Sequence, residues 1–149
     1  MSQISNDHAL RAVLTDLSAD RQRALGARFA KSVIGLNRDE RVARAVETAL
    51  KVDASPAELE DAYRAAKGYA TKTYTDCGKD TDWLAQADHF VAAAVAAALT
   101  PEGDERLNRA WKAAVQARMA VNCAQMEDDK GELEGEAQRQ YRIAEAFLG

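Results

Sequence analysis

The chain has 149 residues with a formal net charge of −4, of which 47% are hydrophobic and only 6% aromatic. That length suits one domain, residues 1–149, with a core large enough to fold without a metal or disulfide staple. The acidic balance disfavours nucleic-acid binding, because neutralising phosphates requires a basic surface.

The composition favours helices over strands. Only two prolines and eight glycines interrupt the chain, and alanine, which has the highest helix propensity, is abundant. We therefore expect an all-α fold: a single irregular bundle of about six or seven helices around an alanine-rich central helix.

Apolar residues at helical spacing predict three helices in the first third of the chain. They cover about residues 7–17, 19–36 and 40–52. Ser5 or Asn6 is the expected cap of the first, Ser18 of the second and Asp39 of the third. Several arginines lie here, but acidic residues alternate with them, which is typical of a solvated surface.

The fourth predicted helix, about 56–75, has the clearest boundary. Ser55-Pro56-Ala57-Glu58 combines a capping serine, proline at the first helical position and glutamate three residues after the cap. Tyr63, Tyr69 and Tyr74 are expected on its inner face, with hydroxyls reaching polar partners or the surface. The alternative is an aromatic patch that contacts another protein.

The central helix is predicted at about 82–99, capped by Thr81 or Asp80. From Phe90 to Leu99 it is apolar on every side, which is typical of a buried helix. Its main buried face is expected to carry Leu84, Ala87, Val91 and Ala98. Asp82, Gln86 and His89 share the opposite face, so His89 is expected to be exposed or at a second interface.

Two more helices complete the prediction, from about Asp104 to Met126 and from the turn at 127–131 to Leu148. In the helix from about Asp104 to Met126, Arg118 falls on the apolar side with Trp111 and Val121. Asn122 is a further polar residue next to this apolar side. A buried guanidinium must be paired. Asp88 or Glu47 is its expected internal partner; alternatively its stem snorkels outward or it points into a groove. Trp83 and Trp111 are expected core anchors, although Trp83 could lie at a rim.

No catalytic residue, metal or cofactor is predicted. The residues three before His8 and His89 are Ser5 and Gln86, so no Glu-x-x-His pair occurs, and His-Glu-x-x-His and Cys-x-x-Cys are absent. The aspartates at 76–82 do not fit an EF-hand and are better explained as helix caps. Cys77 and His89 form the one thiol–imidazole pair worth considering, without a glycine-rich loop to hold an oxyanion or phosphate.

The N-terminal residues lack the pattern of a signal peptide. Cys77 and Cys123 are isolated in a chain that needs no staple, so we expect a reduced, cytoplasmic protein.

Several segments resemble alanine-rich, all-helical bacterial and phage-associated proteins described as immunity proteins. The segments are Leu17-Ser18-Ala19-Asp20-Arg21 leading to Phe29, residues 39–47, the central helix, and residues 136–148. The likeness loosely covers residues 18–148. It implies a binding protein that neutralises a toxin or effector, and no functional residue is carried over.

The leading expectation is a non-catalytic module that binds another protein through an acidic or tyrosine-bearing face. An immunity-like role against a basic nuclease requires a contiguous acidic patch. The alternative is a ligand-binding or enzymatic bundle with an internal polar site around Arg118. An exposed alanine face would also suit a homodimer. The candidate binding residues are Arg118, Asn122, His89, Asp82, Tyr63 and Tyr69.

Overall fold

The computed structural model describes residues 4–74, 82–101, 107–127 and 135–149. Within these ranges the chain forms seven α-helices, one 3₁₀ helix and no strand, which confirms the predicted all-α bundle. The elements are α1 (Asp7–Thr15), α2 (Ala19–Lys31), η1 (Ile34–Leu36), α3 (Glu40–Leu50), α4 (Pro56–Tyr74), α5 (Trp83–Leu99), α6 (Arg109–Glu127) and α7 (Glu136–Leu148).

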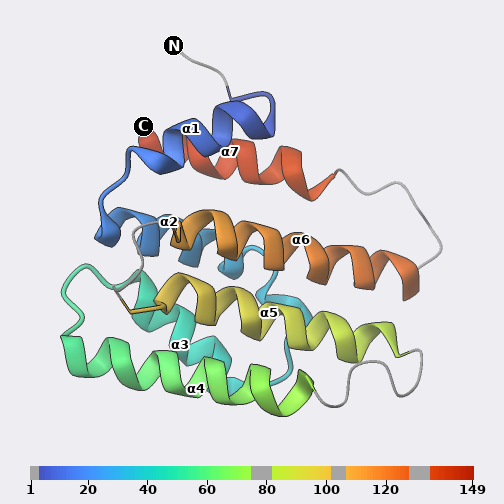
Figure 1. The fold of residues 1–149 in the computed structure, drawn as a ribbon. Helices are drawn as coiled ribbons and strands as arrows, with labels where there is room; N and C mark the ends of the chain where they lie inside the picture. Colours follow the sequence, from blue (N-terminus) through green and yellow to red (C-terminus); the bar gives the residue numbers. More distant parts are fainter. Residues whose placement is uncertain (1–3, 75–81, 102–106, 128–134) are drawn as a thin grey trace.

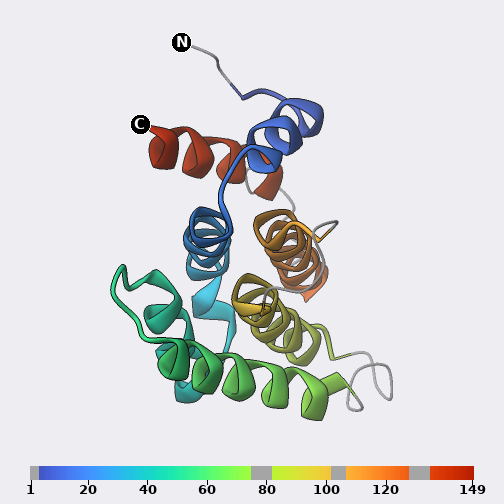
Figure 2. The ribbon, with the colours of Figure 1, turned by 60° about the vertical axis from the view of Figure 1, so that its left-hand side comes forward.

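The helices stack in layers, visible from two directions in Figures 1 and 2. α1 and α7 lie side by side at one end, followed by α2 and α6, then α5 with α3, and α4 at the other end. α5 contacts α2, α3, α4 and α6, and among the described helices its contact with α6 is the most extensive. The alanine-rich helix is therefore central, as its sequence predicts.

Most predicted caps are confirmed. Asn6 Oδ1 accepts from Ala9 N at 2.8 Å, Ser18 caps α2, and Asp39 caps α3. Ser55 and Glu58 form the reciprocal pair, with both hydrogen bonds at 3.1 Å.

Three helix starts and one helix end differ from the prediction. α7 starts at Glu136, after Gly135, rather than directly after the turn at 127–131. Asp82, rather than Thr81 or Asp80, caps α5 by accepting from Ala85 N at 3.1 Å. α6 starts at Arg109 instead of about Asp104, because the Asn108 side chain caps it and the two residues before Arg109 are not helical. α2 ends at Lys31, and a separate 3₁₀ turn follows. Runs of residues with capping oxygens leave the starting residue ambiguous in the sequence.

Small residues bring three helices close together at Gly26. A Cβ placed there would lie 3.2 Å from Ala98 Cβ and 3.3 Å from both Ala110 Cα and Ala113 Cβ. α2, α5 and α6 therefore meet at a point where only a hydrogen fits comfortably.

The buried apolar residues form two clusters. The first, which we call the alanine cluster, consists mainly of alanine and valine from α2 to α6. Its members include Ala27, Ala30, Val42, Val46, Ala66, Val91, Val95, Ala98, Ala113 and Ala117. The second, the leucine cluster, joins α1 and α7 to the outer faces of α2 and α6. Its members include Leu10, Leu14, Leu25, Phe29, Tyr141 and Ala144.

Several side chains are less buried than their spacing predicts. Leu84 is 41% exposed because α5 becomes buried only from Ala87 onward. Tyr74, in the last turn of α4, is 70% exposed. Trp83 and Trp111 are half-buried. No helix in the described ranges is both long and apolar enough to cross a membrane.

Candidate functional site

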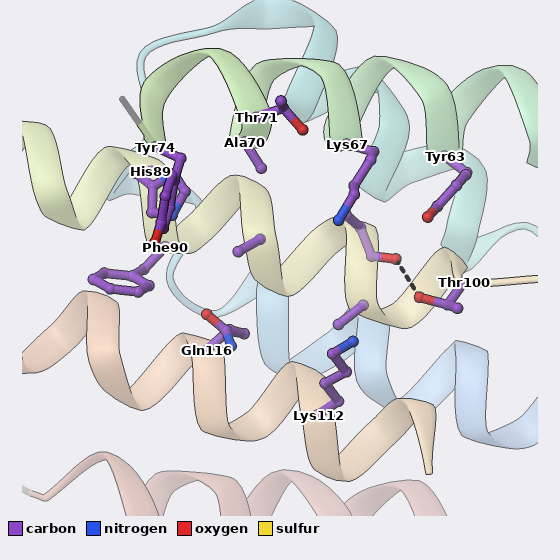
Figure 3. Close-up of a pocket in the computed structure, with 13 residues that line it drawn as sticks. Tyr63, Lys67, Ala70, Thr71, Tyr74, His89, Phe90, Thr100, Lys112 and Gln116 are labelled. Atoms are coloured by element: carbon purple, nitrogen blue, oxygen red, sulfur yellow. Dashed lines mark hydrogen bonds between the residues drawn. The ribbon is translucent and has the colours of Figure 1, made fainter. Parts of the chain in front are cut away.

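A groove runs over α5 between α4 and α6, with a volume of about 540 Å³ (Figure 3). Its floor is the outer face of α5, where the alanine side chains are too short to fill the space between the flanking helices. We call it the α5 groove; its described lining residues are Tyr63, Lys67, Ala70, Thr71, Tyr74, His89, Phe90, Ala93, Ala96, Ala97, Thr100, Lys112 and Gln116.

The described lining of the groove is positively charged although the chain is acidic. Lys67 from α4 and Lys112 from α6 extend their ammonium groups toward the space between these helices (Figure 3). No carboxylate occurs among the described lining residues, and neither lysine pairs with a carboxylate of the described chain. Two uncompensated cations over an apolar floor favour an anionic occupant.

Aromatic rings close one end of the α5 groove. The ring centroid of His89 lies 5.9 Å from that of Tyr74 and 5.0 Å from that of Phe90. His89 is 7% exposed, and its Nδ1 lies 2.9 Å from Thr73 Oγ1. The expectation of an exposed His89 is therefore wrong, and the second-interface alternative is right, since the ring is enclosed between α5 and α4.

The protonation of His89 follows from this burial. Thr73 Oγ1 donates to Tyr69 O at 2.8 Å, so the Thr73 oxygen is left to accept a hydrogen bond from Nδ1–H of His89. Burial lowers the pKa of His89 below its ordinary value, against the opposing effects of the Ala70 carbonyl and Asp88. A neutral imidazole at this end leaves the lysines as the source of positive charge.

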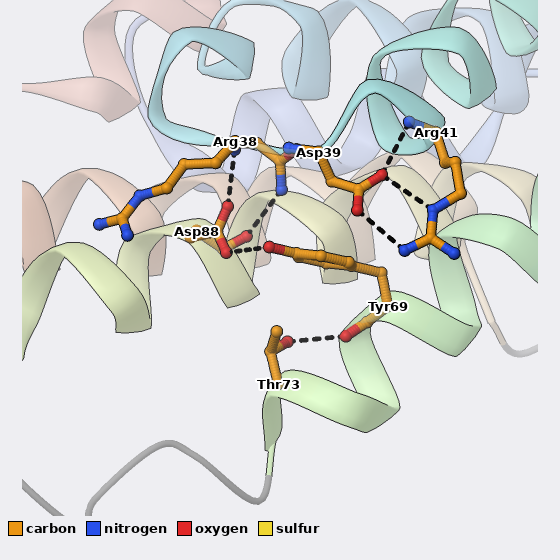
Figure 4. Close-up of polar contacts among 7 residues, drawn as sticks. Arg38, Asp39, Arg41, Tyr69, Thr73 and Asp88 are labelled. Atoms are coloured by element: carbon orange, nitrogen blue, oxygen red, sulfur yellow. Dashed lines mark hydrogen bonds and ion pairs between the residues drawn. The ribbon is translucent and has the colours of Figure 1, made fainter.

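Tyr69 is not among the residues that line the α5 groove, and its hydroxyl binds the buried carboxylate of Asp88 (Figure 4). Its hydroxyl donates to Asp88 Oδ2, while Arg38 N donates to Oδ1 at 2.8 Å. The Asn37 side chain donates to the Asp88 carbonyl at 3.1 Å. Burial, reinforced by Asp88, raises the pKa of Tyr69 to about 12. This network ties α4 and the segment between η1 and α3 to α5, so it holds the α4 wall of the groove against its α5 floor.

Arg118 belongs to a structural network at the opposite end of the molecule. Its Nη1 and Nη2 bind both oxygens of Asp7 at 2.9 and 2.7 Å, and its Nε donates to Gln140 Oε1 at 2.8 Å. The predicted partners, Asp88 and Glu47, are wrong. Spacing placed Arg118 on an apolar face, but that face packs against α1 and α7 rather than against α3 or α5.

The remaining predicted site residues do not converge. Asn122 is exposed on α6 and Asp82 is occupied as the α5 cap. Only Tyr63 and His89 reach the α5 groove. Cys77 and the acidic segments at 76–80 and 128–129 lie outside the described residues. Among the residues described, no group of three or more His, Cys, Asp or Glu could hold a metal.

The lysines are the residues that sequence reasoning missed. Lys67 lies four residues after Tyr63 and seven before Tyr74, so the tyrosine spacing already placed it on the same helix face. Lys112 had no such signal, because nothing in the sequence shows that its face of α6 opens toward α4.

No protein-family model matches this chain, and no match to it was found among curated proteins or solved structures. The resemblance to immunity proteins therefore stays a prediction.

Proposed function

We propose that this protein binds a small organic anion with an apolar body in the α5 groove. The observation that carries the proposal is the pair of lysines, Lys67 and Lys112, reaching over an alanine floor without a described carboxylate beside them. A volume of about 540 Å³ falls within the range of about 300–1,000 Å³ typical of small-molecule sites.

The groove accommodates such a ligand in three parts. Ala93, Ala96 and Ala97 line the groove with apolar side chains. Tyr74 and Phe90 border it with aromatic rings (Figure 3). The ammonium groups reach over this surface, where a carboxylate, sulfonate or phosphate of the ligand would displace their water. This role corresponds to the ligand-binding alternative derived from the sequence, moved from Arg118 to the α5 groove.

The test is isothermal titration calorimetry with 8-anilinonaphthalene-1-sulfonate, an aromatic sulfonate of suitable size. We expect one saturable site, with amide NMR shifts centred on Ala93, Ala96 and Ala97. The double variant Lys67→Gln/Lys112→Gln should bind at least about tenfold more weakly, because each charge-assisted contact contributes appreciably to affinity.

The matched control is Lys31→Gln/Lys51→Gln, which removes the same charge from lysines that pair with Glu47 and Glu58 away from the groove. It should bind like the unmodified protein. Equal weakening in both double variants, or shifts centred on other helices, would contradict the proposal.

A protein partner is the second candidate. Leu84 in the first turn of α5, Met119 near the middle of α6 and Met126 in its last turn are 41%, 40% and 61% exposed. Exposed methionines are common on surfaces that bind proteins. A pull-down from the native host at physiological salt tests this: one stoichiometric partner, lost from Met119→Asp/Met126→Asp, supports it, and a partnerless bait contradicts it.

The immunity-like version of that candidate has weaker support. It requires an uncompensated acidic patch, but seven of the described carboxylates lie in ion pairs with neighbouring cations. They are Asp7, Asp20, Asp39, Glu47, Glu58, Glu60 and Glu136. The acids at 102–105 and 128–134 lie outside the described residues.

A further inference from the structure

A second cavity, of about 610 Å³, lies where the first turns of α2 and α4 meet the end of α5 and the start of α6. It shares Tyr63 and Thr100 with the α5 groove, so the two spaces adjoin. We call it the arginine cavity, because Arg23, Arg64 and Arg109 all line it.

Arg109 is the unusual member of this set. It is only 8% exposed, yet no carboxylate of the described residues pairs with it. Its Nε donates to the Thr100 carbonyl at 2.5 Å, and its backbone N–H donates to Gln22 Oε1 at 3.2 Å. These bonds fix the guanidinium in place, and neither terminal nitrogen has a hydrogen-bond acceptor among the described residues. Buried arginines are normally paired with an anion, and the described residues supply none to Arg109.

Arg23 adds a second incompletely satisfied guanidinium to the same cavity. Its side chain is 18% exposed, and its Nε is buried without a hydrogen-bond partner in the described structure. Its Nη1 contacts Asp20 Oδ1 at 3.1 Å, but the Asp20 side chain is 83% exposed and stays largely solvated. Asp20 therefore compensates Arg23 only weakly.

Arg64, the third arginine of the cavity, is already paired with a carboxylate. It pairs with Glu60 at 2.8 Å, and both side chains are mostly exposed, at 73% and 58%. This pair neutralises itself at the rim. Among the described residues, the interior of the cavity thus holds Arg23 and Arg109 against one solvated carboxylate, so these residues carry a net positive charge.

From this arrangement we infer that the arginine cavity binds the phosphate group of a small molecule, held by Arg23 and Arg109. Guanidinium groups match phosphate oxygens in geometry and charge. The two arginines come from different helices, α2 and α6. A phosphate group carries up to two negative charges and three acceptor oxygens directed to different sides, which suits two guanidinium groups, whereas a carboxylate carries one charge on two coplanar oxygens. Leu59, Leu99 and Pro101 form an apolar wall for the rest of the molecule.

The experiment is an NMR titration of the isotopically labelled protein with inorganic phosphate at constant ionic strength, set with sodium chloride. We expect saturable shifts of the amides of Arg23, Thr100 and Arg109. Arg109→Gln and Arg23→Gln should each weaken binding at least about tenfold, since each removes a charge-assisted contact. Phenyl phosphate should bind several-fold more tightly than phosphate, because its ring reaches the apolar wall.

Two variants serve as controls. Arg64→Gln removes an equal charge from the rim and should change phosphate affinity less than about twofold. Lys67→Gln/Lys112→Gln should leave phosphate binding intact, which separates this site from the α5 groove. Circular dichroism melting of each variant verifies the fold. The inference is overturned if the shifts do not saturate with phosphate, or if sodium chloride displaces phosphate and abolishes the shifts. It is also overturned if folded Arg109→Gln binds phosphate like the unmodified protein.

Discussion

The two apolar clusters fill the space between their helices in different ways. The leucine cluster fills its space with large side chains, among them Leu10, Leu14 and Phe29, each fully buried. The alanine cluster brings backbones together instead, to the point where a Cβ at Gly26 would be crowded. Short side chains seal an interface only where the helices stay close. Where α4 and α6 diverge over α5, the same alanines leave a groove, so the cavity is a consequence of the alanine-rich core.

The largest difference between the two clusters is expected from a substitution at Phe29. Phe29→Ala removes a fully buried ring from the leucine cluster and should destabilise the protein by about 3–5 kcal/mol. Val95→Ala, equally buried in the alanine cluster, should cost only about 2 kcal/mol, because it removes less apolar surface. Urea unfolding followed by circular dichroism measures both, and equal losses would refute the contrast.

A smaller loss of stability is expected from removing the polar contacts that join α1 and α7 to α6 beside the leucine cluster. Arg118→Met leaves Asp7 without its cation and Gln140 Oε1, in a fully buried residue, without a donor. We expect a loss of about 2–3 kcal/mol at neutral pH, and a stabilised variant would contradict this assignment.

The pH dependence of the same variant provides a check. The Arg118 guanidinium holds the pKa of Asp7 below its ordinary value. The folded state therefore favours the ionised carboxylate, and its contribution is full above the ordinary pKa and lost as pH falls through the lowered one. The stability difference between the unmodified protein and Arg118→Met should accordingly narrow below about pH 3.8.

The smallest expected changes in stability come from two glycine-to-alanine substitutions, and they should have opposite signs in the tightly packed core and on the open surface. Gly26→Ala gains helix propensity but crowds α5 and α6, so we expect a net loss of about 1 kcal/mol. Gly68→Ala, on the exposed face of α4, meets no atom within 4 Å and should stabilise by about 0.5–1 kcal/mol. Thermal unfolding of both variants, side by side, tests the prediction, and two changes of the same sign would contradict it.

The sequence by itself determined the helices and most of their ends. Local signals suffice for this, because a cap such as Ser55 with Glu58 acts within one turn, and an all-apolar stretch such as 90–99 has to be buried wherever its neighbours lie. It also placed Arg118 correctly on an apolar face and anticipated a polar partner for Tyr69.

Only the tertiary structure decided which faces meet. Arg118 pairs with Asp7, 111 residues away, and Lys67 lies across the α5 groove from Lys112 on another helix. Helical periodicity specifies which residues share a face but carries no information about which helix covers it. Both proposed sites depend on that missing information, since the α5 groove and the arginine cavity are formed by residues of several helices that packing alone brings together.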